Sequence, residues 1–147
     1  MRLRNKPGAT EELLQHPSIV IQNPETKKGQ WHTVFGNNNP IHIEVGTGKG
    51  QFLTGMSQAH QEINYIGIEK YDSVIITALE RIQEAGMTNF KLLNEDVGNL
   101  PNYFSSGEIG RVYINFTDPW PKNRHEKRRL TYEGFLKMYE QVMNKNG

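Results

Sequence analysis

Short apolar runs recur along the chain from residue 41 onward and are typical of buried strands. The four runs cover residues 41–45, 65–68, 90–93 and 112–116. Between them, apolar residues at helical spacing predict helices over 51–59 and from about 72 to a stop at Gly86, with Asp72 or Ser73 as the N-cap. A last helix is expected from about Thr131. The pattern is therefore strand and helix in alternation.

Strands that alternate with helices or crossovers predict an α/β fold with a parallel sheet and flanking helices. Residues 1–39 are polar and irregular apart from a short helix expected at 10–15, with Thr10 as its cap. We expect them to form a basic arm and an irregular segment ahead of one domain at 40–147. The aromatic-rich stretch 29–35 is expected to pack this segment onto the domain, with a lid over a ligand as the alternative. A fifth strand would follow residue 147, so we expect the domain to be truncated after its fourth strand and helix.

The composition fits a single globular domain: 147 residues, 35% hydrophobic and 22% charged. There is no cysteine, which excludes disulfides, thiolate metal sites and a cysteine nucleophile. The five histidines lack metal-ligand spacing, and His42 is expected to be a core or interlayer residue. No apolar run has the length of a membrane span or a signal peptide, so we expect a cytoplasmic protein that binds neither membrane nor metal.

The net charge of +1 conceals an uneven distribution. Residues 122–129 hold five Lys or Arg against one Glu, and Arg2, Arg4 and Lys6 form a second basic group, so the rest of the chain is acidic. Such an arrangement favours an anionic partner that is bound at defined places. Solvated charge clusters without a partner are the alternative.

Acidic side chains lie at or after the end of each predicted strand, where parallel sheets bind ligands. They are Glu44, Glu69, Asp96 and Asp118. Glu44 precedes the glycine-rich turn Gly46-Thr47-Gly48-Lys49-Gly50. Gln51 replaces the third glycine of the dinucleotide motif, and Lys49 is misplaced for a phosphate-binding loop.

Glycines at 46 and 48 allow the backbone to approach a ligand closely. The charge of Glu44 suits a cation rather than a phosphate, Glu69 is placed to accept ribose hydroxyls, and Asp96 is placed to meet an adenine edge. A cationic nucleoside without phosphate matches S-adenosylmethionine. A glycine turn that only links a strand to a helix is the alternative.

The segment EVGTGKG, with these acids, resembles the first motif of class I S-adenosylmethionine-dependent methyltransferases. The segment DPWPKNRHEKRRL, residues 118–130, closely resembles the signature of the bacterial tRNA (guanine-N7-)-methyltransferases. RNKPGA, IEVGTGKG, YIGIE and VYINF are also similar to that family. Methyltransferases that act on exocyclic amines carry an acid or Asn, then Pro-Pro-aromatic, whereas Asp118 is followed here by Pro-Trp-Pro. That departure argues against amine methylation.

The resemblance implies a Rossmann-like fold and methyl transfer from S-adenosylmethionine to N7 of guanine in the tRNA variable loop. It implies that Asp118 is catalytic. The cofactor would be bound by Glu44, Gly46, Gly48, Glu69, Asp96 and Asp118. The tRNA would be bound by Lys122, Arg124, His125, Glu126, Lys127, Arg128 and Arg129.

Guanine N7 has a free lone pair and needs no deprotonation, so the lack of an obvious strong base is compatible with this reaction. Trp120 either packs into the domain or stacks on a base. Three other interpretations stay open: a non-catalytic RNA-binding protein on a methyltransferase-like scaffold, an inactive fragment, and a nicotinamide oxidoreductase, which Gln51 and Glu44 disfavour. The sequence favours neither a monomer nor a homodimer.

Overall fold

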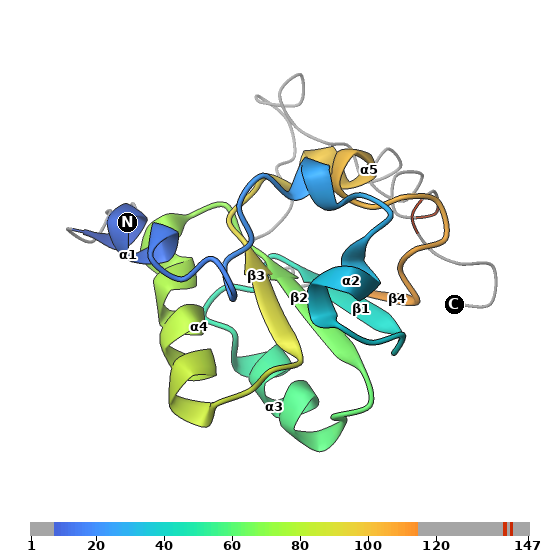
Figure 1. Cartoon of the computed structure of the whole chain (residues 1–147). Helices are drawn as coiled ribbons and strands as arrows, with labels where there is room; N and C mark the ends of the chain where they lie inside the picture. The colour runs from blue at the N-terminus through green and yellow to red at the C-terminus, as the bar shows by residue number, and fades with distance from the viewer. Residues whose placement is uncertain (1–7, 115–139, 141, 143–147) are drawn as a thin grey trace.

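The computed structural model describes residues 8–114 together with Glu140 and Val142. Within these residues, four parallel strands form one sheet in the order β3-β2-β1-β4 (Figure 1). The strands are β1 (Ile41–Val45), β2 (Asn64–Ile68), β3 (Phe90–Leu93) and β4 (Arg111–Ile114). The predicted α/β fold with a parallel sheet is therefore confirmed.

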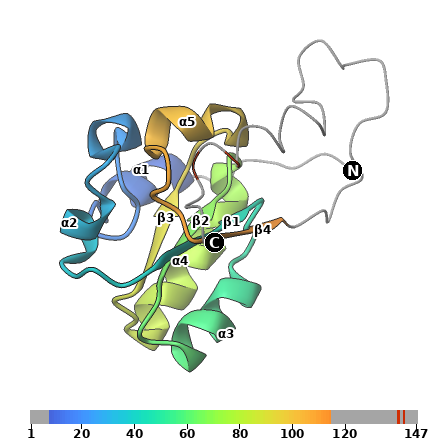
Figure 2. The same cartoon turned by 90° about the vertical axis from the view of Figure 1, so that its right-hand side faces the viewer.

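Helices cover both faces of this sheet (Figures 1 and 2). They are α1 (Ala9–Leu14), η1 (Pro24–Lys27), α2 (Trp31–Phe35), α3 (Gln51–Ala59), α4 (Asp72–Ala85), η2 (Val97–Asn99) and α5 (Leu100–Tyr103). One apolar layer joins α3 and α4 to the sheet through residues such as Leu53, Leu79 and Tyr65. The other joins α2 and α5 to the opposite face through Trp31 and Ile43. Alternate strand residues thus supply two separate cores.

The N-terminal segment lies along the edge of the sheet at β3. Val20 forms a parallel bridge with Leu92. The Leu92 N–H donates to the Ile19 carbonyl at 2.8 Å, and the Ile21 N–H donates to the Leu92 carbonyl at 3.0 Å. These bonds satisfy backbone groups that an edge strand would otherwise leave unpaired.

The aromatic-rich stretch 29–35 packs the N-terminal segment onto the domain, as predicted. Trp31 is fully buried, and its ring N–H donates to the Tyr103 carbonyl at 2.7 Å. The Glu108 carboxylate accepts the backbone N–H groups of Gly29 at 2.9 Å, Trp31 at 3.0 Å and Ser105 at 2.8 Å. One carboxylate therefore joins the start of α2 to the loop before β4.

Two predicted helix caps are wrong, although the helices are present. Thr10 lies inside α1, whose N-cap is Gly8, and its hydroxyl donates to the Asp72 carboxylate. Asp72 begins α4 after the N-cap Tyr71, so neither Asp72 nor Ser73 is the cap. The two polar side chains available for capping at Thr10 and Asp72 bind each other instead and connect α1 to α4. Gly86 ends α4 at φ 66°, as predicted.

His42 is a packed residue of β1, as predicted. Its ring meets the Tyr65 ring edge-on, with centroids 5.7 Å apart, and burial lowers its pKa.

β4 ends at Ile114 in the described part of the chain, and the predicted strand residues 115 and 116 lie outside it. Most of the helix predicted from Thr131 is also outside it, but Val142 is buried and its carbonyl accepts the Ile109 N–H at 2.8 Å. No helix within the described residues is long and apolar enough to cross a membrane.

Candidate functional site

The glycine turn after β1 has a backbone that ordinary residues rarely adopt. Gly46, Gly48 and Gly50 have φ angles of 73°, 61° and 80°. The N–H groups of Gly46 and Thr47 both donate to the Ile68 carbonyl, at 2.8 and 3.0 Å. The left-handed glycines allow the chain to reverse without strain, and the two bonds attach the turn to the end of β2.

Glu44, in β1 just before this turn, is buried, with 4% of its surface exposed. The Thr47 hydroxyl donates to Glu44 Oε1 at 2.6 Å. Burial raises the pKa of Glu44 to about 7, the nearby Glu69 carboxylate raises it slightly further, and the Thr47 hydrogen bond opposes the increase. The ionised form of Glu44 is therefore costly unless a cation approaches it.

The Thr47 side chain occupies the space beside Gly67, a residue of β2 that has no side chain of its own. A Cβ added to Gly67 would lie 2.7 Å from the Thr47 hydroxyl oxygen and 2.9 Å from its Cβ. Such distances are shorter than any normal contact, so a larger residue would displace Thr47 and, with it, the hydrogen bond to Glu44. Sequence reasoning did not identify Thr47 or Gly67 as site residues.

Glu69, just after β2, binds the glycine turn from the other side. Its Oε1 accepts the Gly48 N–H at 3.0 Å, and its Oε2 accepts the Tyr71 N–H at 3.3 Å. Burial raises the pKa of Glu69, and these backbone bonds oppose the increase. The Asn94 amide donates to the Glu69 carbonyl at 3.1 Å, which links the end of β3 to the end of β2.

Asp96 follows β3 and is exposed to solvent. Its Oδ1 accepts the Gly98 N–H at 2.9 Å and caps η2, a local role that sequence reasoning missed. The neighbouring Glu95 accepts the Tyr103 hydroxyl at 3.1 Å, and burial raises its pKa. Asp96 thus stands at the adjacent strand end, next to a second carboxyl that the sequence pattern did not single out.

The structure brings four predicted site residues together through the contacts above: Glu44, Gly46, Gly48 and Glu69. Asp96 lies one strand further along the same edge. The remaining predicted residues lie outside the described part of the chain: Asp118, Lys122, Arg124, His125, Glu126, Lys127, Arg128 and Arg129. No group of three or more metal-ligating side chains occurs among the described residues.

This arrangement fits a cationic nucleoside and disfavours a phosphate. In the described part of the chain neither Glu44 nor Glu69 has an ion-pair partner, since the two ion pairs there involve other residues. Two half-buried or buried carboxylates beside a glycine turn would repel a phosphate and attract a positive charge. The chemistry of the site therefore matches the sulfonium and ammonium groups of S-adenosylmethionine.

The chain is similar to methyltransferases both in sequence and in fold. A family profile described as "Putative methyltransferase" matches residues 38–147. Among solved structures, the antibiotic-resistance methyltransferase Kmr matches 79% of this chain and 60% of its own at a TM-score of 0.59 and 19% identity. A protein called PKMT2 from Rickettsia typhi, solved in complex with AdoHcy, matches 84% of this chain and 23% of its own, also at 0.59 and with 17% identity. At these identities the structural matches establish the fold, which is that of methyltransferases.

Two relatives that are similar in sequence over the whole chain share one name. A tRNA (guanine-N(7)-)-methyltransferase from Halalkalibacterium halodurans is 60% identical over the whole chain, which spans 67% of that relative. The protein of the same name from Bacillus subtilis is 58% identical over the whole chain, which spans 69% of it. The chain belongs to the tRNA (guanine-N(7)-)-methyltransferase family.

Proposed function

We propose that this protein transfers the methyl group of S-adenosylmethionine to N7 of guanine in tRNA, in the variable loop. The observation that carries the proposal is the 58–60% identity to tRNA (guanine-N(7)-)-methyltransferases over all 147 residues. A nicotinamide oxidoreductase would need the third glycine that Gln51 replaces.

The cofactor would be held at the carboxyl edge of β1, β2 and β3. Glu44 would face its positive charge, Gly46 and Gly48 would allow close approach, and Glu69 has lone pairs left to accept ribose hydroxyls. Asp96, which is exposed, would meet the adenine edge. When bound, the cofactor supplies a methyl group on a positively charged sulfur. By holding that group at fixed carboxylates, the chain would set its direction relative to the incoming base.

The reaction needs alignment more than acid–base chemistry, because the N7 lone pair attacks without losing a proton. Holding the reacting atoms in near-attack geometry can supply about 7–11 kcal/mol of the barrier. We propose that Asp118, at the start of DPWPK, orients the guanine and stabilises the positive charge that develops on it, in addition to lining the cofactor site. Pro119 and Pro121 would restrict the backbone that joins it to the basic segment.

The basic segment 122–129 would fix the position of the RNA by phosphate contacts, which set register without reading sequence. Its proposed members are Lys122, Arg124, His125, Glu126, Lys127, Arg128 and Arg129. We also propose that residues 1–39 act as a basic arm and irregular segment before a methyltransferase domain at 40–147. The enzyme would act in the cytoplasm and without a metal.

The test uses the protein expressed from its whole gene, methyl-labelled S-adenosylmethionine and an unmodified tRNA transcript. Label recovered in 7-methylguanosine supports the proposal, and label in another nucleoside overturns the target assignment. Retained tRNA binding without any label would favour the non-catalytic RNA-binding interpretation.

Asp118→Asn tests the catalytic role within the same assay. Loss of a group that stabilises developing charge costs about 10²–10³-fold in turnover, so we expect a loss of that order. Glu84→Gln, at an exposed carboxyl on α4, is the matched control and should keep full turnover. Full turnover in Asp118→Asn would show that the assigned role is wrong.

A further inference from the structure

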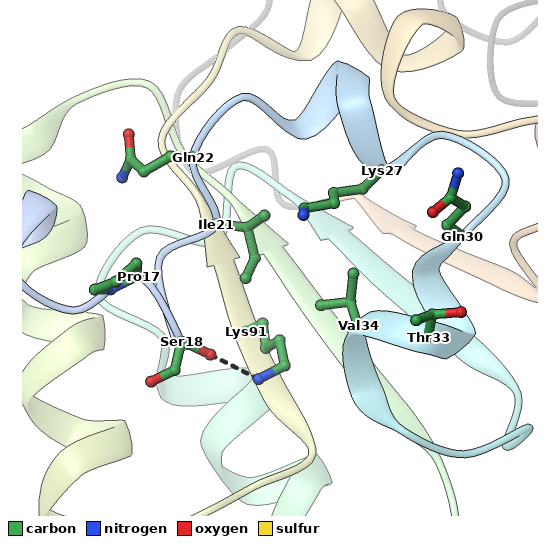
Figure 3. A pocket seen from close by; sticks show the side chains of 9 residues that line it. All are labelled: Pro17, Ser18, Ile21, Gln22, Lys27, Gln30, Thr33, Val34 and Lys91. Atoms are coloured by element: carbon green, nitrogen blue, oxygen red, sulfur yellow. Dashed lines mark hydrogen bonds between the residues drawn. The ribbon is translucent and has the colours of Figure 1, made fainter.

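A pocket of about 460 Å³ lies between the N-terminal segment, α2 and β3. It is on the face of the sheet that α2 covers, and its lining side chains come from segments far apart in the sequence (Figure 3). Since one water occupies about 30 Å³ of liquid, the pocket has room for a solvated ionic group. It shares no lining residue with the strand-end site described above.

Lys91 contributes one positive charge to this pocket. It is the second residue of β3, and its ammonium donates to the Ser18 carbonyl at 2.6 Å and lies 5.5 Å from the centre of the Phe35 ring. Burial lowers the pKa of Lys91. The contact with Ser18 explains how Lys91 holds the N-terminal segment, but a carbonyl does not neutralise an ammonium, so the charge is still uncompensated.

Lys27, the last residue of η1, contributes the second charge. Its side chain points toward Ile21, while Lys91 lies on the other side of Ile21 and Val34 with its ammonium turned to Ser18 (Figure 3). No lining residue is a carboxylate, and neither lysine has an ion-pair partner among the residues that the structure describes.

The uncharged part of the lining is suited to an anion as well. Gln22 and Gln30 bring side-chain amides, and Ser18 and Thr33 bring hydroxyls, all of which can donate hydrogen bonds. Ser18, Gln30 and Thr33 are exposed, so a group attached to a large molecule can reach the pocket. A lysine ammonium is a flexible point charge, whereas the planar guanidinium of arginine binds in a fixed bidentate geometry. Lysines therefore suit a contact with a backbone phosphate, which positions the RNA without recognising its base sequence.

We infer that this pocket binds a phosphate group of the RNA backbone through Lys27 and Lys91, as a contact additional to the basic segment 122–129. The inference rests on the proposed function, which supplies the RNA. Asp96 follows Lys91 by five residues, at most about 17 Å along an extended chain, so an RNA of tRNA size can reach the strand-end site and the pocket together. The contact would add affinity and orientation without sequence preference.

The experiment compares Lys27→Gln with Lys28→Gln in the protein expressed from its whole gene. Lys28 is the next residue, is exposed, and does not line the pocket, so it carries the same charge without the proposed contact. The affinity for tRNA is measured over a range of salt concentrations. Each phosphate contact contributes about 0.7–0.9 to the slope of log K against log salt. We expect Lys27→Gln to lose about that amount and Lys28→Gln to keep the wild-type slope.

Further outcomes distinguish failure of the inference from failure of the proposed function. Affinity for S-adenosylmethionine should be equal in both variants, which shows that the strand-end site is intact. Equal slopes in Lys27→Gln and Lys28→Gln, with a wild type that binds and methylates tRNA, would overturn the inference and leave the proposed function standing. Failure of the wild type to bind tRNA at all would instead overturn the proposed function. Inorganic phosphate that protects Lys27 from acetylation, while the tRNA slope is unchanged, would overturn the RNA assignment in favour of a small free anion.

Discussion

The Thr47 hydroxyl donates a 2.6 Å hydrogen bond to Oε1 of Glu44, and both residues are buried. The bond favours the ionised carboxylate, which is the form that a cationic cofactor requires. Thr47 is therefore a positioning residue that acts through Glu44. It lies between the two glycines that the sequence motif emphasises.

Thr47→Val removes this hydroxyl and keeps a side chain of similar shape. The pKa of Glu44 should rise further, and the affinity for S-adenosylmethionine at neutral pH should fall by about tenfold or more, since a hydrogen bond to a charged group contributes about 1.5–3 kcal/mol. Isothermal titration calorimetry measures the affinity. Thr47→Ser keeps the hydroxyl and should stay close to wild type. Equal affinities in the Val and Ser variants would contradict the role.

The affinity for S-adenosylmethionine should depend on pH around 7, because burial raises the pKa of Glu44 to about 7. Below that value the carboxyl is protonated, and the affinity should fall by up to about tenfold for each pH unit. Glu44→Gln should bind weakly and with little pH dependence between 6 and 8. A wild-type affinity that is constant over this range would contradict the assignment of Glu44 to the positive charge of the cofactor.

Stability without cofactor should change in the opposite direction. The pKa of Glu44 is raised in the folded state, so between its ordinary value of 4.5 and about 7 the folded protein holds a proton that the unfolded chain releases. This contribution to stability is present below pH 4.5 and is lost as the pH rises through 7. Thermal unfolding of wild type and Glu44→Gln at several pH values checks this, because the wild type should lose stability between pH 4.5 and 7 and the variant should lack that loss. The stability of the variant minus that of the wild type should therefore rise with pH, and a signed difference that falls with pH would contradict the shift.

Gly67→Ala should destabilise the protein and weaken cofactor binding together. The added Cβ would collide with Thr47, and overpacking of this kind costs about 1–3 kcal/mol. Gly55→Ala is the matched control, because a Cβ there has no neighbour within 4 Å and Gly55 lies within α3. It should instead raise the free energy of unfolding by about 0.5–1 kcal/mol. Urea unfolding and calorimetry on both variants check the pair.

Glu108→Gln should loosen the N-terminal segment. The carboxylate accepts hydrogen bonds from three backbone N–H groups through its two oxygens. A glutamine amide has only one oxygen, and its NH₂ group cannot accept the remaining bonds. We expect a loss of about 1–3 kcal/mol in unfolding free energy and faster hydrogen exchange at Gly29, Trp31 and Ser105. Glu80→Gln, an exposed residue of α4, should change neither. Unchanged exchange at Gly29 and Trp31 would mean that the Glu108 carboxylate does not hold this part of the segment.

Local patterns were sufficient to predict the sheet. The bounds of β1 and β3 agree with the prediction, because each is a short apolar run next to polar or glycine residues, and burial on both faces leaves little choice of structure. Gly86 was predicted for the same kind of reason, since a left-handed C-cap is a local requirement. The acidic edge followed from the alternation of elements, whereas the order of the strands, β3-β2-β1-β4, was not predicted.

Interactions between distant residues could not be predicted in this way. Thr10 and Asp72 each satisfy a local rule for capping, yet they bind each other across 62 positions in sequence. Glu108 bonds Gly29 and Trp31 at separations of 79 and 77. The role of Thr47 was only weakly indicated by the sequence: its hydroxyl lies three residues after the buried Glu44 and can therefore reach that carboxyl. The roles of Asp118 and residues 122–129 stay predictions.

The bridge between Val20 and Leu92 also bears on how the protein behaves at high concentration. A free β3 edge would present a row of unpaired amides to the strands of other molecules, which is a route to aggregation. Residues 19–21 occupy that edge. Detachment of the N-terminal segment, for example by proteolysis within 22–30, would therefore be expected to lower solubility before it lowered the affinity for cofactor.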